Sequence, residues 1–202
     1  MARVGLVPGS FKPYHAGHDA VVRLASREND RVVVYASLSD RGNVSGTAMG
    51  QAWKRLIEPT LPANVEVVYG GSPVGHVYAA LGAADAEGSG DSFTVYSDAD
   101  DISTNYRTLG RYAPELVERG QVHLKAVDRS STVDVSGTEM RSWLAAGERA
   151  RFIAHLPTQV DGGALWQLLR SSAPAQATRG RSKQKVEAVD SLRTLVKLAL
   201  RG

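Results

Sequence analysis

Short apolar runs alternate with helical patterns along the first 127 residues of this chain, and this alternation constrains its fold more than any other feature. The expected strands cover residues 4–7, 31–37, 65–69, 92–96 and 121–126, and the expected helices between them cover 16–28, 48–58, 74–84 and 102–109. The first two strands are continuous apolar runs, which is typical of strands buried on both faces. Repeated strand–helix units need right-handed crossovers, so the sequence predicts an α/β fold: a five-stranded parallel sheet with helices on both faces.

The pattern changes after Val127 and divides the chain. Residues 128–134 are polar, and further short helices are expected from about Thr138 and over 152–156 and 164–169. We therefore expect a main domain over 1–157, a short helical extension over 158–171, a linker over 172–183 and an amphipathic helix over 184–202. This last helix carries apolar residues at positions 186, 189, 192, 195, 196 and 199, which is close to helical spacing.

The linker and the last helix each have two interpretations. The apolar face of the helix packs on the chain's own domain, or it contacts a protein partner or a second copy of the chain. Arg179, Arg181, Lys183 and Lys185 make the linker region basic. A solvated linker is the ordinary interpretation of such a charge run, and contact with nucleic acid or another polyanion is the alternative.

Composition excludes several classes of function. The 202-residue chain contains no cysteine, which excludes disulfides, thiolate zinc sites and cysteine nucleophiles. No apolar run approaches the roughly 20 residues that a membrane span needs, and the chain begins with an apolar strand rather than the long apolar segment of a signal peptide. We therefore expect a cytoplasmic protein that does not enter a membrane. The net charge of +3 is small and suits anionic substrates such as nucleotides.

The segment 9–18, Gly-Ser-Phe-Lys-Pro-Tyr-His-Ala-Gly-His, lies where the first strand is followed by the first helix. Ligands of open parallel sheets bind at this edge, outside the carboxyl ends of the strands. Gly9 permits a tight turn and close approach of the backbone to a ligand, and the helix N-terminus favours phosphate. His15 and His18 are three residues apart, so both can face one phosphate group, and Gly17 between them has no obstructing side chain. The segment predicts a phosphate site.

A second polar segment precedes the helix expected near Thr138. Ser136, Gly137 and Thr138 place hydroxyl and N–H groups at another positive helix end, and Arg141 lies one turn inside that helix. Ordinary helix capping, with Glu139 in the first turn, would explain these residues taken alone. Together with the two histidines they predict that two helix N-termini hold a triphosphate.

These two segments, in this order, resemble the signatures of the nucleotidylyltransferase superfamily that carries His-x-Gly-His. That superfamily includes nicotinamide mononucleotide, phosphopantetheine and glycerol-3-phosphate nucleotidyltransferases. The resemblance covers residues 3 to about 157 and implies a Rossmann-like fold. The second signature, Ile-Ser-x-Thr-x-x-Arg, corresponds to residues 135–141 here, with Val135 in place of Ile and Gly137 where many relatives carry Ser or Thr.

The implied reaction transfers a nucleotidyl group from a nucleoside triphosphate to a phosphorylated acceptor and releases pyrophosphate. Positioning and charge stabilisation suffice for such chemistry. His15 and His18 are expected to donate to α- and β-phosphate oxygens, Lys12 to follow the transferring phosphate, and Arg141 to clamp the β- and γ-phosphates. The nucleotide-binding residues expected beside them are Gly9, Ser10, Phe11, Gly17, Ser136, Gly137 and Thr138. The resemblance favours ATP over CTP. Mg²⁺ is expected to be held largely by the nucleotide and water rather than by protein ligands.

The acceptor site is less defined in the sequence. Arg41, Arg55 and Asp98 are the expected acceptor-binding residues, because their loops or helices follow the second and fourth strands. Arg41 has a solvent-facing loop position as its alternative, and Asp98 has capping of the next helix. Trp53 either stacks on a substrate ring or, as we favour, belongs to the core.

Other classes of protein compete with this interpretation. The main alternative is a nucleotide-binding structural or regulatory protein that docks on a larger assembly through its C-terminal helix and does not catalyse a reaction. An aminoacyl-tRNA-synthetase-like activation domain lacks its Lys-rich second signature here, and the phosphate-loop motifs of dehydrogenases and P-loop enzymes are missing. A zinc site is disfavoured because His76, His123 and His155 are scattered along the sequence.

Overall fold

The computed structural model describes residues 1–127 and 135–172. The polar segment 128–134, most of the expected linker 172–183 and the expected helix 184–202 lie outside the described residues, so their interpretations stay predictions. Within the described ranges no helix is both long and apolar enough to cross a membrane.

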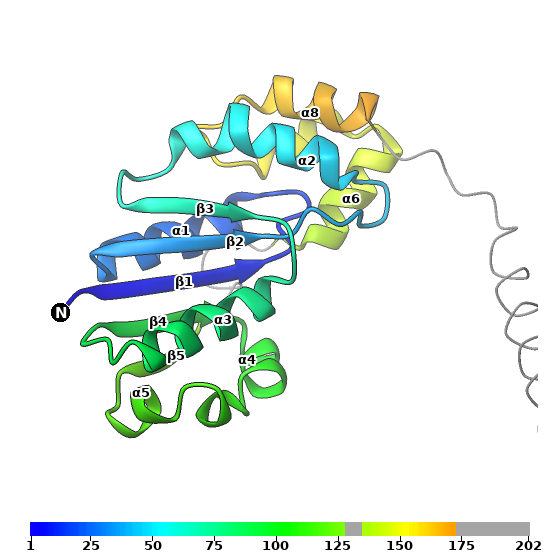
Figure 1. The fold of residues 1–202 in the computed structure, drawn as a ribbon. Helices are drawn as coiled ribbons and strands as arrows, with labels where there is room; N and C mark the ends of the chain where they lie inside the picture. Colours follow the sequence, from blue (N-terminus) through cyan, green and yellow to red (C-terminus); the bar gives the residue numbers. More distant parts are fainter. Residues whose placement is uncertain (128–134, 173–202) are drawn as a thin grey trace, which may run out of the picture.

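Five parallel strands form one sheet in the order β3–β2–β1–β4–β5 (Figure 1). They are β1 (Arg3–Gly9), β2 (Arg31–Ala36), β3 (Val65–Tyr69), β4 (Ser92–Ser97) and β5 (Val122–Ala126). The central strand β1 aligns Leu6 with Val33 of β2 and with Val95 of β4. All three side chains are buried on the same face of the sheet. The predicted α/β fold with a five-stranded parallel sheet is confirmed.

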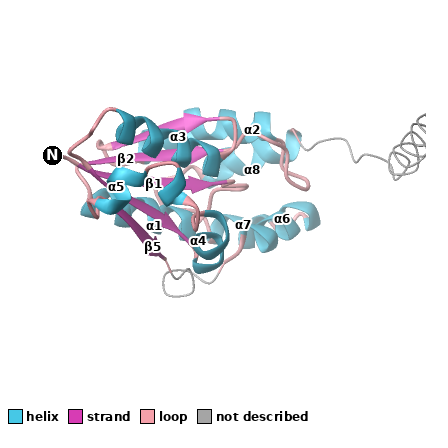
Figure 2. Cartoon of the chain, turned by 60° about the horizontal axis from the view of Figure 1, so that its bottom comes forward, coloured by secondary structure: helices cyan, strands magenta, loops and turns pink. Residues whose placement is uncertain are grey.

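Helices cover both faces of this sheet (Figures 1 and 2). One face packs against α1 (Ala16–Glu28), α2 (Gly46–Ala52), α6 (Gly137–Ala146), α7 (Arg149–Ala154) and α8 (Gly162–Ser171). The other face packs against α3 (Pro73–Ala86), α4 (Ala99–Asn105) and α5 (Pro114–Glu118). The apolar residues of β1 and β2 therefore alternate between two separate cores, which is why both strands read as continuous apolar runs.

The observed helices differ in detail from the predictions. The single helix expected over 48–58 is α2, followed by a π-helix (Trp53–Ile57) and a 3-10 helix (Glu58–Thr60), because Pro59 has no N–H with which to continue the α-helical pattern. The helix expected over 102–109 begins earlier, at Ala99, because Asp98 caps it. It ends at Asn105, and a separate 3-10 helix covers Leu109–Arg111. The short α5 was not predicted.

The described residues after 157 pack on the core of the α1 face. Leu165 and Leu169 of α8 are buried there, and the Trp166 ring meets Phe152 of α7 at a centroid distance of 5.2 Å. Arg170 Nη1 donates to the carbonyl of Leu144 at 2.9 Å, which fixes α8 beside α6. The boundary between residues 157 and 158 stays a prediction, and helix α8 adds to the same apolar layer.

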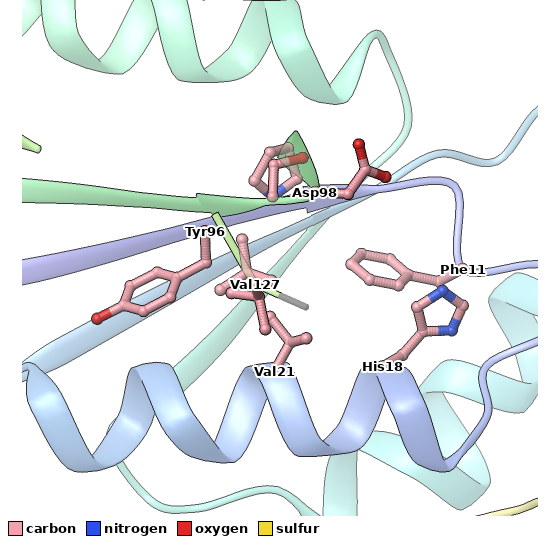
Figure 3. A pocket seen from close by; sticks show the side chains of 9 residues that line it. Phe11, His18, Val21, Tyr96, Asp98 and Val127 are labelled. Carbon is pink, nitrogen blue, oxygen red and sulfur yellow. The ribbon is translucent and has the colours of Figure 1, made fainter. Parts of the chain in front are cut away.

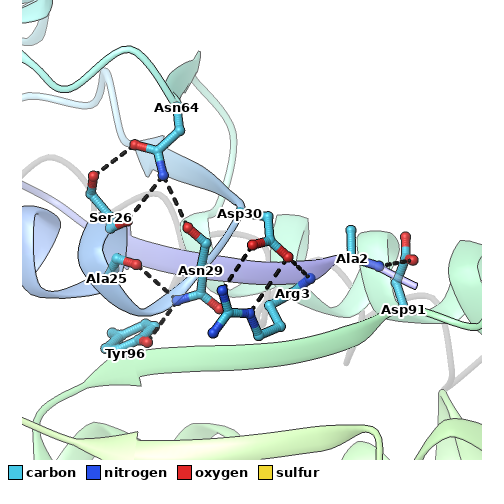
Figure 4. A network of polar contacts seen from close by, with 9 residues as sticks. All are labelled: Ala2, Arg3, Ala25, Ser26, Asn29, Asp30, Asn64, Asp91 and Tyr96. Atoms are coloured by element: carbon cyan, nitrogen blue, oxygen red, sulfur yellow. Dashed lines mark hydrogen bonds and ion pairs between the residues drawn. The ribbon is translucent and has the colours of Figure 1, made fainter.

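A polar network holds α1 at the amino edge of the sheet (Figure 4). Asn29 Nδ2 donates to the Ala25 carbonyl at 2.8 Å and to Tyr96 Oη at 2.7 Å, which ties the end of α1 to β4. Asn64 Nδ2 donates to the carbonyls of Asn29 and Ser26, each at 3.0 Å. Because this end of α1 is fixed, the helix presents its N-terminus at the opposite, carboxyl edge of the sheet.

The loop after β2 lies directly on the N-terminus of α2. A Cβ added at Gly46 would stand 1.7 Å from the Leu38 carbonyl oxygen, and Asp40 Oδ1 accepts the Gly46 N–H at 2.8 Å. Only glycine fits at this contact, because any side chain would collide with backbone. The contact fixes the path of residues 38–45.

We expect Gly46→Ala to lower the free energy of unfolding by about 3 kcal/mol or more, since the added methyl group overpacks a backbone contact. Chemical denaturation would measure the loss. Gly50→Ala is the matched control in the same helix, because its Cβ would meet the flexible end of Leu38 at 3.1 Å rather than backbone. Equal stabilities of the two variants would contradict the proposed contact.

Candidate active site at the carboxyl edge of the sheet

The loop between β1 and α1 carries the first predicted segment and lies at the carboxyl edge of the sheet, as expected. Gly9 ends β1, and the aromatic ring of Phe11 folds back over it, so that a Cβ at Gly9 would stand 2.7 Å from Phe11 Cζ. Phe11 has a left-handed backbone with φ of 48°, and the Lys12–Pro13 peptide is cis. The Phe11 ring therefore occupies the space beside Gly9, in the tight turn predicted there.

The two histidines of the loop lie together at the beginning of α1. Their ring centroids are 3.7 Å apart with an interplanar angle of 30°. His15 is buried and His18 is partly buried, and Gly17 between them is buried as well. The edge of the Phe11 ring contacts His18 at a centroid distance of 5.0 Å. Both imidazoles are thus held at the helix N-terminus, where a phosphate group is favoured.

Lys12 is a buried cation beneath this loop. Its side chain is 1% exposed, and its Nζ donates to Ser37 Oγ at 3.3 Å. Ser37 Oγ in turn lies within hydrogen-bond distance of Ser39 Oγ, at 2.8 Å. Burial lowers the pKa of Lys12, the positive charge of Arg41 lowers it further, and Asp40 partly opposes both. Ser37 was not among the site residues predicted from the sequence, where its only signal is a hydroxyl at the end of a buried strand.

Arg41 extends from the loop after β2 over the loop after β1. Its exposed guanidinium donates from Nη1 to Ser10 Oγ at 2.6 Å. The main chain of Arg41 pairs with Val44 in a narrow antiparallel turn. Of the acceptor-binding residues predicted from sequence, Arg41 is brought to the predicted phosphate segment.

Arg141 joins the second predicted segment to the first. Its Nη1 donates to the Lys12 carbonyl at 2.8 Å, and its Nη2 donates to Thr138 Oγ1 at 2.9 Å. Partial burial lowers the pKa of Arg141, and the nearby Arg41 lowers it further. The N-termini of α1 and α6 therefore lie at the same part of the carboxyl edge.

Two glycines leave room for the Arg141 side chain. A Cβ at Gly137 would stand 3.2 Å from Arg141 Nη1, and one at Gly42 would stand 3.2 Å from Arg141 Cδ. Asn43 Nδ2 also donates to the Arg141 carbonyl at 3.1 Å. The glycine at position 137, a departure from the motif it resembles, therefore allows the guanidinium to reach the Lys12 carbonyl.

Ordinary helix capping, the alternative considered for the second segment, explains Ser136 and Glu139. Ser136 and Glu139 form a reciprocal capping box: Ser136 Oγ accepts the Glu139 N–H at 3.1 Å, and Glu139 Oε2 accepts the Ser136 N–H at 2.8 Å. The Ser136 hydroxyl thus stabilises the helix N-terminus. Thr138 carries its hydroxyl on the same turn, bonded to Arg141.

A pocket lies between α1 and the carboxyl ends of β1 and β4 (Figure 3). Including its open mouth, it has a volume of about 320 Å³. Its lining comprises Val7, Pro8, Phe11, His18, Val21, Tyr96, Ser97, Asp98 and Val127. Figure 3 shows the Phe11 and His18 rings at one end and Val21 and Val127 between them and Tyr96. The walls are mostly apolar, with an imidazole and a carboxylate among them.

Asp98 has two roles in the structure. Its carboxylate accepts the Asp101 N–H at 2.7 Å and caps α4, which was the alternative considered for it, and it also lines the pocket. Arg55 is exposed on the π-helix, and no hydrogen bond or ion pair links it to the described site residues. Trp53 is fully buried against Phe11 and Tyr14, in the core position favoured from the sequence.

The site is strongly cationic. The charge of Arg41 contributes to the lowered pKa of Lys12 and of Arg141, and two imidazoles and two helix N-termini lie beside these cations. Of the nearby carboxylates, Asp40 accepts the Gly46 N–H and Glu139 belongs to the capping box. No group of three His, Asp or Glu side chains within residues 1–127 and 135–172 converges to hold a metal ion. This arrangement can bind a polyanion and stabilise negative charge that develops on it.

Comparisons with known proteins identify the fold. No protein-family model matches this chain. The comparison with curated proteins gives no match either. A Vibrio parahaemolyticus structure, described as a candidate nicotinate-nucleotide adenylyltransferase, is similar over 84% of this chain and 99% of its own, with 17% identity and a TM-score of 0.53. Thermotoga maritima TmcAL, bound with alpha-thio ATP, is matched over 85% of this chain with 14% identity and a TM-score of 0.48, and this chain spans only 56% of its length. At such identities the likeness concerns architecture: the chain has the Rossmann-like α/β fold of the Vibrio protein.

Proposed function

We propose that this chain is a nucleotidylyltransferase that transfers AMP, in preference to CMP, from a nucleoside triphosphate to a phosphorylated acceptor and releases pyrophosphate. The observation that carries the proposal is the bond of 2.8 Å from Arg141 Nη1 to the Lys12 carbonyl, which brings two helix N-termini and the paired His15 and His18 rings to one edge of the sheet. The likeness of the fold to a candidate adenylyltransferase supports it and favours adenine.

The triphosphate binds across the beginnings of α1 and α6. Each helix N-terminus carries a partial positive charge that favours phosphate. Arg141 lies between them with a planar, permanently charged guanidinium, which suits β- and γ-phosphate oxygens. The nucleoside enters the pocket beside His18, where Val21 and Val127 cover the base and Asp98 accepts a ribose hydroxyl.

The acceptor binds on the opposite side of β1, toward β2. Arg41 and Ser10 lie on that side, because the loop after β2 crosses the loop after β1 there. The exposed guanidinium of Arg41 takes the acceptor's phosphate. Lys12 belongs to the loop after β1, and its Nζ reaches the same side by donating to Ser37 Oγ after β2.

In the reaction, an oxygen of the acceptor phosphate forms a bond to the α-phosphorus as the bond to the bridging α–β oxygen breaks. Pyrophosphate leaves with the electron pair of that bond. His15 and His18 donate hydrogen bonds to α- and β-phosphate oxygens as negative charge increases there, and Lys12 stabilises the transferring group. These residues position the substrates and stabilise charge, so the chain needs no nucleophile of its own.

Mg²⁺ belongs to this proposal as a companion of the triphosphate. The described residues offer no protein cage of carboxylates or imidazoles for it. A metal held by phosphate oxygens and water fits that chemistry, because Mg²⁺ commonly keeps several waters. No step above is assigned to the metal.

A screen of phosphorylated metabolites with ATP and with CTP, measuring pyrophosphate release, tests the proposed function. We expect release that depends on both substrates and is faster with ATP. Tight binding of ATP without pyrophosphate release with any acceptor would instead favour a binding protein.

We expect His18→Ala to lower kcat about 10²-fold or more, because the variant loses a donor to the charge that develops in the transition state. Steady-state kinetics would measure the effect, and circular dichroism would verify that the fold persists. His123→Ala, an exposed histidine on the edge strand β5, is the matched control and should keep wild-type turnover. Wild-type kcat in His18→Ala would remove His18 from the mechanism.

The alkaline limb of the pH profile of kcat/KM should depend on Arg41. Because burial and Arg41 lower the pKa of Lys12, the ammonium group loses its proton at a lower pH than an exposed lysine does. We therefore expect kcat/KM to fall as the pH rises through this lowered pKa. Arg41→Gln removes one cause of the shift, so its limb should move to higher pH, whatever the variant's absolute activity. An unmoved limb would contradict the assignment to Lys12, and Arg111→Gln, on the other face of the sheet, should leave the limb unchanged.

A further inference from the structure

Tyr14 and Asp19 flank the four residues His15 to His18 and are bonded across them. Tyr14 Oη donates to Asp19 Oδ1 at 3.1 Å. Tyr14 is fully buried and Asp19 is 7% exposed. The histidine segment is therefore closed by a hydrogen bond between the two residues at its ends.

This bond is anchored to a distant part of the chain. Asp19 Oδ2 accepts from Arg23 Nε at 2.6 Å, one turn further along α1. Arg23 Nη2 in turn donates to the Thr60 carbonyl at 3.0 Å, at the end of the 3-10 helix before β3. Three side chains thus connect the histidine segment to the layer that contains α2.

The Tyr14 ring also contacts the rings around it. It lies at 26° to the His18 ring, with centroids 5.9 Å apart, and meets the buried Trp53 ring at 4.8 Å. Trp53 contacts Phe11 as well, at 5.6 Å. The orientation of Tyr14 is therefore linked to that of His18 by a direct ring contact.

The buried carboxylate of Asp19 needs an explanation, because burying a carboxylate costs free energy unless it is paired and hydrogen-bonded. An acidic residue in the first helical turn is favourable at the surface, but that effect requires neither burial nor a bond to Tyr14. Burial and the adjacent Asp19 raise the pKa of Tyr14 well above its ordinary value, so the phenol remains a donor at neutral pH. The arrangement is explained if it holds the histidine segment in one geometry.

We propose that Tyr14, Asp19 and Arg23 are positioning residues that fix the His15 and His18 rings against the triphosphate. This role rests on the proposed function. Misplacing a catalytic group by about 1 Å can cost roughly 10²-fold in rate, and losing one positioning bond while the ring remains should cost less, about fivefold to twentyfold in kcat. The KM for the nucleotide should stay within about twofold, because the cations that bind it are unchanged.

Tyr14→Phe tests this role, with Tyr78→Phe as the matched control. Tyr78 Oη donates to the Asn105 carbonyl at 2.6 Å on the other face of the sheet, so both variants lose one hydroxyl and its hydrogen bonds. We expect similar losses of thermal stability and a fall of kcat in Tyr14→Phe alone. An equal fall in Tyr78→Phe, or no fall in Tyr14→Phe, would overturn the proposal.

Two further measurements keep the test independent of the reaction. The imidazole NMR signals of His15 and His18, recorded without substrate, should shift in Tyr14→Phe and not in Tyr78→Phe; unchanged signals in Tyr14→Phe would overturn the positioning role. A wild-type chain that reacts with no acceptor would count against the proposed function, and the ring signals would still decide the positioning role.

Should Tyr14→Phe fail to fold, Asp19→Asn should keep more of the wild-type ring signals than Asp19→Ala, since the amide can still bond Tyr14. Equal signals in these two would overturn the role.

Discussion

The site depends on one hydrogen bond that joins two segments 129 residues apart, from Arg141 Nη1 to the Lys12 carbonyl. It holds the beginning of α6 against the loop after β1, while Met140 and Leu144 of α6 pack in the same core as Phe11. Gly42 and Gly137 leave room for this side chain, since a Cβ at either position would approach the arginine to 3.2 Å. The backbone carbonyl that accepts this bond belongs to Lys12, so a single residue supplies both the attachment point and a buried positive charge.

Among the described residues, positive charge is concentrated at this edge of the sheet. Burial lowers the pKa of both Lys12 and Arg141, and the positive charge of the nearby Arg41 lowers each further. The nearby Asp40 and Glu139 already accept backbone N–H groups. Such an arrangement favours an anionic ligand, because a polyphosphate would relieve the repulsion among the cations. The same argument explains why hydroxyls of Ser10 and Ser37, rather than carboxylates, accept from Arg41 and Lys12.

The sequence predicted the sheet well because each strand is a short apolar run with clear limits, and residues 65–69 agree with β3 to the residue. It also placed His15, His18 and Arg141 near the correct helix ends, since capping and strand order are local signals. Contacts between distant segments could not be predicted this way. The bond from Tyr14 to Asp19 needs the burial that Trp53 provides, and the contact of Arg41 with Ser10 depends on the path that Gly46 imposes on its loop. Helix α5 has five residues, too few for a periodic signal to emerge.

The amino edge of the sheet is held by a network of side-chain amides, whereas the carboxyl edge consists of loops, so the two edges should diverge in sequence at different rates. Asn29 and Asn64 hold the amino edge through hydrogen bonds to neighbouring backbone and to the hydroxyl of Tyr96 (Figure 4). The carboxyl edge is made of loops, such as residues 38–45, that rest on this fixed frame. Under the proposed function, mutations in those loops can alter acceptor preference while the amide network preserves the fold. Homologues of this architecture should differ most in length and composition between β2 and α2, and least around the asparagine pair.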